Sequence, residues 1–314
     1  MADTTGGADV RVLVIGGWGR CGSTLLDMLL GQLDGFVSAG EIRELWLRGC
    51  VEDRPCGCGE KFSSCPFWTE VGERAYGGWD RLDLETVMRV RYGWDRVWGM
   101  PRLVWSRDHG SHSADLAVYT DALRRLLAAI SAASGGSVVI DSSKLPTHTV
   151  MLQQLPGLDL RMLHLVRDSR GVAYSNQKHE NKVATDDGST TPPRYGASTS
   201  ALRYDLYNGL TSALGRNADL PYLRLRYEDL TADPERRIRE ILRHAGVDAD
   251  RDLPYLHEGS ADLRPNHLVD GNPVRFAKGP VRIRLDDEWQ RSLSRRDRRT
   301  VTALTLPLLR AYDY

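Results

Sequence analysis

The feature that most constrains the fold of this chain is an apolar run that leads through a glycine-rich turn into an apolar helix pattern. Residues 12–15 are short, apolar and rich in β-branched side chains, which is typical of a buried strand. They are followed by the turn GGWGRCGST and then by TLLDMLLGQL. A strand, a glycine-rich loop and a helix in this order begin a phosphate-binding βα unit. The sequence therefore predicts a parallel sheet with an anion site at this loop.

Three further runs predict strands of the same sheet, at residues 137–140, 161–166 and 222–227. The last precedes Asp233 and Pro234, a helix cap followed by proline at the first helical position, and that helix is expected to stop at Gly246. Strands that alternate with helices predict an α/β fold in which helices cover both faces of a central parallel sheet. We expect one domain over residues 1–314, with less regular insertions at about 48–115 and 176–200.

Composition narrows the classes of partner. The 314 residues include 42 Lys plus Arg and 42 Asp plus Glu, so the formal net charge is zero and no nucleic-acid partner is expected. A hydrophobic content of 41% is too high for a disordered chain. The first residues lack a signal-peptide pattern and no run has the roughly 18 apolar residues of a membrane helix, so we expect a cytoplasmic protein without a transmembrane segment. The composition is rich in Arg and Ala and poor in Lys, which indicates a bacterial source. The sequence gives no indication of the oligomeric state.

The glycine-rich turn differs from the loop of nucleoside triphosphatases. Gly17 and Gly22 have the G-x-x-x-x-G spacing, but Ser23 stands where those loops carry a lysine, and the cation comes earlier, at Arg20. The backbone N–H groups and the helix N-terminus still offer an anion site. The missing lysine argues against a nucleotide kinase or hydrolase, and a purely structural turn is the other alternative.

At these residues the chain resembles a known family. GRCGSTLL, followed by SAGEIRELW, resembles the first motif of sulfotransferases that use 3′-phosphoadenosine 5′-phosphosulfate (PAPS), closest in style to the Golgi carbohydrate and tyrosylprotein enzymes and their bacterial relatives. The resemblance implies a P-loop-like fold and a 5′-phosphosulfate site at Arg20, Cys21, Gly22, Ser23, Thr24 and Leu25.

Three later motifs extend the resemblance in family order. VRDSRGVAYS implies that Arg167 and Ser175 bind the 3′-phosphate, and YEDLTADP implies that Tyr227 lies beside the adenine. RFAKG resembles the loop that closes over the 3′-phosphate, which implies roles for Arg275, Lys278 and Gly279. An insertion between the arginine and the Lys-Gly pair leaves open which of the two cations makes the contact.

The resemblance also implies a mechanism. Glu41 is the candidate general base, with Glu44 as the fallback, and Lys144 with Arg20 would stabilise the charge that develops on the sulfuryl group and the departing phosphate. The structural alternatives are that Glu41 merely begins a helix and that IDSSKLP is only a polar turn. No metal is required for this reaction, and the products are a sulfate ester and adenosine 3′,5′-bisphosphate.

The acceptor is less constrained. We expect a hydroxyl group on a small molecule, a sugar or a lipid-linked metabolite, with secondary metabolism as the setting. The insertions are candidates for the acceptor pocket. The tryptophans at positions 46, 94, 98 and 105 line such a pocket or, as is more common, belong to the core. His164 is interpreted as a core histidine, and His148 and His179 as weaker candidates for the pocket. A non-catalytic nucleotide-binding protein is a further alternative, although Glu41 and Lys144 are both present.

Four of the five cysteines, Cys50, Cys56, Cys58 and Cys65, fall within 16 residues. Their spacing lacks the paired C-x-x-C of common zinc sites, so free thiols, a zinc site and one or two disulfides all remain open. A zinc ion or a disulfide here would order the insertion and take no part in the chemistry.

Overall fold

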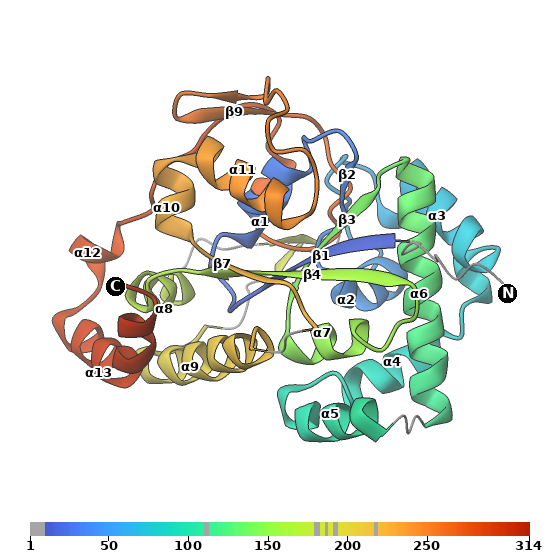
Figure 1. Ribbon diagram of the computed structural model, residues 1–314, viewed down its shortest axis with the longest axis horizontal. Coiled ribbons are helices and arrows are strands. Elements are labelled where there is room, and N and C mark those ends of the chain that lie inside the picture. The colour runs from blue at the N-terminus through green and yellow to red at the C-terminus, as the bar shows by residue number, and fades with distance from the viewer. Residues whose placement is uncertain (1–9, 110–112, 179–182, 186–187, 191–193, 217–218) are drawn as a thin grey trace, which may run out of the picture.

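The computed structural model describes residues 10–109, 113–178, 183–185, 188–190, 194–216 and 219–314 (Figure 1). Its centre is a parallel sheet of five strands in the order β2-β3-β1-β4-β7. These strands are β1 (Val10–Gly16), β2 (Phe36–Ser38), β3 (Val138–Lys144), β4 (Leu158–Val166) and β7 (Tyr222–Arg226). The predicted α/β fold with a central parallel sheet is confirmed.

Four of these strands were predicted from their apolar runs, and β2 was not. β2 has only three residues, too few to show a periodicity, and it forms the edge of the sheet beside β3. Its register with β3 pairs Phe36 with Val138 and Ser38 with Ile140. The carboxyl end of β2 therefore lies next to that of β3, which brings Glu41 and Lys144 to the same place.

Helices cover both faces of the sheet (Figure 1). The side chains of β1 alternate between two clusters: Leu13 and Ile15 pack with α1 and α11, whereas Val12 and Val14 pack with α2, α6 and α7. The helices are α1 (Ser23–Leu30), α2 (Ile42–Leu45), α3 (Pro66–Tyr76), α4 (Leu84–Gly93), α5 (Met100–His109), α6 (Ala114–Ser134), α7 (Pro146–Leu152), α8 (Ser169–Gln177), α9 (Ala197–Leu214), α10 (Tyr227–Ala232), α11 (Pro234–His244), α12 (Trp289–Ser292) and α13 (Arg295–Ala311).

The capping signals of α11 act as the sequence predicts. The Asp233 side chain accepts a hydrogen bond from the Arg236 amide, and Pro234 occupies the first turn. The helix ends at His244, and Gly246 takes a φ of 67°, the left-handed conformation that ends helices at glycine.

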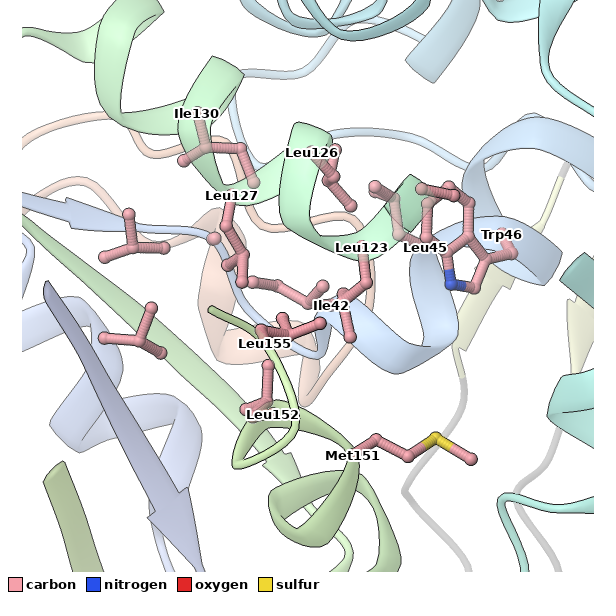
Figure 2. Packing of buried hydrophobic residues seen from close by; sticks show 14 of the residues in the cluster. Ile42, Leu45, Trp46, Leu123, Leu126, Leu127, Ile130, Met151, Leu152 and Leu155 are labelled. Atoms are coloured by element: carbon pink, nitrogen blue, oxygen red, sulfur yellow. The ribbon is translucent and has the colours of Figure 1, made fainter. Parts of the chain in front are cut away.

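The short helix α2 is held by its neighbours, because four residues cannot form a stable helix alone. Figure 2 shows Ile42, Leu45 and Trp46 packed against leucines of α6 and the end of α7. Trp46 is fully buried. Burial of this kind is worth about 1.5–3 kcal/mol per large apolar side chain, so the core holds the segment that begins at Glu41.

The insertion at residues 48–115 is more regular than expected, since it contains α3, α4 and α5, and both α3 and α4 pack against α6. Helix α3 begins at Pro66 and ends before Gly77, whose φ is 75°. These are ordinary start and stop signals. Part of the insertion at 176–200 lies outside the described residues, and so does His179. Within it, β5 (Val183–Thr185) pairs antiparallel with β6 (Gly188–Thr190).

A second small sheet lies beyond the central one. It contains β8 (Leu256–His257), β9 (Ser260–Leu263) and β10 (Gly279–Arg282) in antiparallel pairing. Residues 264–288, termed the C-terminal arm below, follow β9 and include β10. Between these two strands the arm contacts the phosphate loop, where the Asn272 amide donates to Thr24. Among the described residues, no helix is both long enough and apolar enough to cross a membrane.

Candidate active site

The carboxyl ends of the five parallel strands carry five of the residues singled out in the sequence. Arg20 follows β1, Glu41 follows β2, Lys144 ends β3, Arg167 follows β4 and Tyr227 follows β7. Parallel strands bring these ends to one edge, which is where open α/β sheets bind ligands. These five residues thus meet at one edge of the central sheet.

The phosphate loop leads into the N-terminus of α1. Gly17 and Gly22 have φ values of 136° and 96°, and Arg20 itself has a φ of 70°. At Gly22 a Cβ would lie 2.5 Å from Cδ2 of Tyr227, so only glycine fits between the loop and that ring. The amide groups at this helix start are available to an anion.

The remaining loop residues have distinct surroundings. Cys21 and Ser23 are buried, and burial raises the pKa of the Cys21 thiol, which does not favour a reactive thiolate. The Thr24 hydroxyl accepts a hydrogen bond from the Asn272 amide at 3.3 Å, which joins the loop to the C-terminal arm. Leu25 packs at the margin of the α1 and α11 cluster.

Glu41 and Lys144 form an ion pair at the centre of this edge. Lys144 Nζ lies 2.6 Å from Glu41 Oε1 and donates to the Ser142 carbonyl at 2.9 Å. The pairing of β1 with β3 shifts register between Val14 and Gly16, and Lys144 has a φ of 64°. Register irregularities redirect side chains near active sites, and a left-handed lysine costs about 1–2 kcal/mol that the surroundings must offset.

The electrostatic surroundings suit a proton acceptor. Burial raises the pKa of Glu41 to about 7, against the lowering effect of Lys144. Burial lowers the pKa of Arg20 and Glu41 partly offsets this, so the three predicted catalytic groups interact with one another. For Lys144, burial opposes the charged form, but the attraction of Glu41 prevails and its pKa is raised.

Glu44 has a different environment. Its carboxylate is paired with Arg43, with Arg91 and, at 3.7 Å, with Arg48. Burial would raise the pKa of Glu44, but these three arginines together hold it below its usual range. Glu44 is therefore a permanently charged structural group, and Glu41 is the better candidate base.

A buried polar network holds the strand end that carries Lys144. The Ser142 hydroxyl donates to Asp27 at 2.7 Å, and the Arg43 amide donates to the Ser143 hydroxyl at 3.1 Å. His148 Nε2 lies 2.7 Å from an oxygen of Asp141. The ring of His148 is fully buried, so the suggestion that it lines an acceptor pocket is wrong.

Arg167 connects the phosphate loop with the C-terminal arm. Its guanidinium donates to the Arg20 carbonyl at 3.1 Å and to the Asp286 carbonyl at 2.8 Å, and it lies 3.1 Å from the Asp286 carboxylate. It also lies over the Tyr227 ring, 4.7 Å from the centroid. The Tyr227 hydroxyl donates to the Arg284 carbonyl at 3.3 Å.

Ser175 lies half-buried on α8, the helix that starts just after Arg167. Lys178 follows that helix and pairs with Glu288 at 2.6 Å and with Asp286 at 3.7 Å. Arg167 and Lys178 therefore both pair with acidic residues of the arm, and Ser175 lies between them in the sequence.

The loop with Arg275, Lys278 and Gly279 has other contacts. Arg275 is fully buried and donates to the Gly271 carbonyl at 3.1 Å, while its Nε and Nη2 have no hydrogen-bond partner among the described residues. Burial lowers its pKa, and Asp270 is the largest opposing charge. Lys278 Nζ lies 3.5 Å from the Cys58 carbonyl, and Gly279 begins β10 opposite Leu263.

The burial of the histidine and tryptophan side chains decides which of them belong to the core. His164 is fully buried and bonded to the Tyr222 hydroxyl at 2.7 Å and to Asn208 at 2.9 Å, which confirms a core histidine. Trp46 is in the core, Trp94 is half-buried, and Trp98 and Trp105 are exposed by 85% and 55%. A different tryptophan, Trp18 of the phosphate loop, packs against Tyr207 of α9 with centroids 4.3 Å apart.

Sequence reasoning missed three residues of the arm: Asp270, Asp286 and His267. The run Asp286-Asp287-Glu288 was a visible acidic cluster, but nothing in the sequence linked it to Arg167.

None of the five cysteines forms a disulfide, and the sulfur atoms of Cys56, Cys58 and Cys65 come together with His267. Cys50 lies outside that group.

Comparison with known protein families places the chain in one of them. The profile described as "Sulfotransferase family" matches residues 13–251, which is most of the chain. The chain belongs to the sulfotransferase family. The matched segment contains the phosphate loop, Glu41, Lys144, Arg167 and Tyr227. No curated protein matches the sequence.

Several solved sulfotransferase structures are similar over nearly the whole chain. The sulfotransferase domain of the Synechococcus PCC 7002 olefin synthase is 19% identical over 96% of this chain and 97% of its own, with a TM-score of 0.43. The sulfotransferase domain of the curacin biosynthetic pathway is 15% identical over 94% and 97%, with a TM-score of 0.45. Sulfotransferase STF9 from Mycobacterium avium is 12% identical over 97% and 77%, with a TM-score of 0.46.

Proposed function

We propose that this member of the sulfotransferase family transfers a sulfuryl group from PAPS to a hydroxyl acceptor and forms a sulfate ester and adenosine 3′,5′-bisphosphate. The observation that carries the proposal is the ion pair of Glu41 and Lys144, which lies beside a phosphate loop without the Walker lysine. PAPS would supply the activated sulfuryl group. The fit of an anionic donor is supported by Arg275, because the Nε and Nη2 of its buried guanidinium have no hydrogen-bond partner among the residues that the structure describes.

Glu41 would accept the proton of the acceptor hydroxyl. Its pKa of about 7 lets the carboxylate form exist at neutral pH while it remains basic enough to take a proton. Lys144 would then be released from the neutralised Glu41 carboxyl, and its Nζ would stabilise the charge that appears on the departing phosphate oxygen as the S–O bond breaks. Arg20 and the amides of Gly22 and Ser23 would hold the 5′ end.

The far end of the donor would be bound by Arg167 and Ser175. Arg167 is already oriented by the Arg20 carbonyl and by the Tyr227 ring, so a 3′-phosphate there would meet a positioned guanidinium. Tyr227 would lie beside the adenine. The closure of Arg275, Lys278 and Gly279 over the donor stays a prediction.

The two rival functions differ in measurable ways. A nucleotide kinase or hydrolase needs a lysine at Ser23 and should bind ATP with Mg²⁺. A non-catalytic nucleotide-binding protein would bind the bisphosphate but transfer nothing. We propose as acceptor a hydroxyl on a small molecule, sugar or lipid-linked metabolite. A bacterial source, a cytoplasmic location and a role in secondary metabolism belong to the same proposal.

Thermal unfolding with added nucleotides tests the proposal. Adenosine 3′,5′-bisphosphate should raise the melting temperature by mass action, and AMP, ADP and ATP with Mg²⁺ should have much smaller effects. Arg167→Ala should abolish the shift by the bisphosphate, whereas Arg236→Ala, at an exposed arginine of α11, should retain it. Stabilisation by ATP with Mg²⁺ equal to that by the bisphosphate would refute the donor assignment.

A further inference from the structure

Three cysteines and one histidine converge at the contact between the insertion and the C-terminal arm. Cys56, Cys58 and Cys65 come from the insertion, and His267 comes from the arm about 200 residues later in the chain. One potential ligand atom from each lies within 4.8 Å of all the others. We propose that Cys56, Cys58, Cys65 and His267 bind one structural zinc ion.

Four of the six distances between the ligand atoms are close to those of a tetrahedral site, and the other two are within 4.8 Å. With Zn–S bonds of about 2.3 Å and Zn–N bonds of about 2.0–2.1 Å, two sulfurs of a tetrahedron lie about 3.8 Å apart, and a sulfur and a nitrogen about 3.6 Å apart. Cys65 Sγ lies 3.7 Å from both Cys56 Sγ and Cys58 Sγ. His267 Nδ1 lies 3.6 Å from Cys56 Sγ and 3.4 Å from Cys65 Sγ.

Local backbone structure presents the three sulfurs to one point. Cys56 and Cys58 lie in a tight turn closed by the Pro55–Lys61 bridge, and the Cys56 amide donates to the Glu60 carbonyl at 2.7 Å. Gly59 has a φ of 108°, which the turn requires. Cys65 directly precedes α3, an 11-residue helix whose N-terminus favours a thiolate.

The histidine is held by contacts of the kind that orient metal ligands. Its ring stacks on Phe67 with centroids 4.5 Å apart, and its carbonyl accepts a hydrogen bond from Trp68 Nε1 at 2.9 Å. The Gly57 amide donates to the Leu268 carbonyl at 2.8 Å, between Cys56 and Cys58. The stacking and the backbone hydrogen bonds hold His267 beside the three sulfurs.

The alternatives from the sequence fit these distances less well. A disulfide needs about 2.05 Å between sulfurs, far below 3.7 Å, and three cysteines would leave one unpaired. Plain thiols would not require a histidine from a distant segment. Four protein ligands complete a tetrahedral shell, so this zinc would have no open position for substrate and would be structural.

The site would add a metal link between two segments that hydrogen bonds and ring stacking already bring together. Asn266, next to His267, donates to the Arg275 carbonyl at 2.8 Å, and Lys278 reaches the Cys58 carbonyl. Metal binding at His267 would therefore hold the arm in place, as structural zinc does in small loop-rich segments. The inference does not depend on the reaction proposed above.

Metal analysis of the full-length protein, purified without immobilised-metal chromatography or added chelator, provides the test. We expect about one zinc per chain by mass spectrometry of the metal. After denaturation with a chelator, we expect five reactive thiols, the number of free cysteines. Absence of zinc with five thiols would overturn the proposal, and so would three thiols, which would indicate a disulfide.

Variants identify the ligands. Cys58→Ser should remove the zinc, whereas Cys50→Ser, at a neighbouring thiol outside the group, should retain it. His267→Ala should lose zinc to a competing chelator on the order of tenfold more readily, and His267→Cys should restore retention because four cysteines also form a zinc site. If Cys58→Ser does not fold, the His267 pair still decides. Zinc that is retained equally in Cys58→Ser and His267→Ala would be adventitious and would refute the site.

Discussion

The carboxyl edge of the sheet and the C-terminal arm both contribute to the candidate site, but they hold their residues in different ways. At the edge, Arg20, Glu41, Lys144 and Arg167 each follow a strand whose position is set by a ladder of backbone hydrogen bonds and two apolar clusters. In the arm, residues 264–288 include only short helical and extended pieces.

The arm is instead held by separate side-chain contacts. Asn272 bonds to Thr24, Asp286 pairs with Arg167, and His267 meets the three cysteines of the insertion. Regular structure thus places the groups proposed for the chemistry, and long-range contacts place the groups proposed to enclose the donor. Changes at the edge should therefore alter the rate most strongly, whereas changes in the arm should alter affinity and stability.

The largest effect is expected for Glu41→Gln, which keeps the side-chain size but removes the proton acceptor. Sulfuryl transfer, measured with PAPS and a phenolic or sugar acceptor, should fall by about 10²- to 10⁴-fold. Binding of adenosine 3′,5′-bisphosphate should be retained. Glu44→Gln is the matched control on the same segment, and it should lower stability through loss of its arginine pairs while the rate per folded enzyme changes little. Equal losses in both variants would contradict the assignment of the base.

A pH profile should show the next largest effect. Because Glu41 has a pKa of about 7 and acts as a base only when deprotonated, kcat/KM should be constant above that pH and fall below it. At pH 6 the expected value is about one tenth of the plateau. Bisphosphate binding measured over the same range separates titration of the donor phosphates from that of Glu41. A profile that is flat through neutral pH would refute Glu41 as the base.

These expectations also show what sequence reasoning can and cannot predict. Apolar runs predicted β1, β3, β4 and β7, and since parallel strands end at one edge, the residues after them meet there. The partners of the arm left no local pattern: His267 is 202 positions from Cys65, and Asp286 is 119 positions from Arg167. Edge strand β2 was missed because it is short. Within the insertion, a helix near residues 82–98 was predicted and is α4, whereas α3 was missed although Pro66 and Gly77 marked its bounds.

Arg275→Met tests the arm at a buried cation and should have a moderate effect. The guanidinium is fully buried, and its Nε and Nη2 have no hydrogen-bond partner among the described residues. An apolar side chain of similar length should therefore leave the unliganded protein as stable or more stable. The melting-temperature shift produced by the bisphosphate or by PAPS should become smaller, with affinity reduced several-fold. A lower melting temperature with an unchanged ligand shift would make Arg275 a structural residue only.

The smallest expected effect, and the one of opposite sign, is that of Asp286→Asn. The Asp286 carboxylate lies 3.1 Å from Arg167 and 3.7 Å from Lys178, so it would repel a 3′-phosphate that Arg167 binds. The substitution removes this charge but keeps the backbone carbonyl that accepts from Arg167 at 2.8 Å, so the guanidinium stays oriented. Asp286 is 37% exposed, so solvent weakens the repulsion, and we expect the bisphosphate to bind only about two- to fivefold more tightly at low salt.

Glu288→Gln is the matched control, since Glu288 pairs with Lys178 and Tyr174, and it should change affinity less. Weaker binding by Asp286→Asn would mean that the carboxylate positions Arg167 for the donor, and the arm would then act on the site as directly as the sheet edge does.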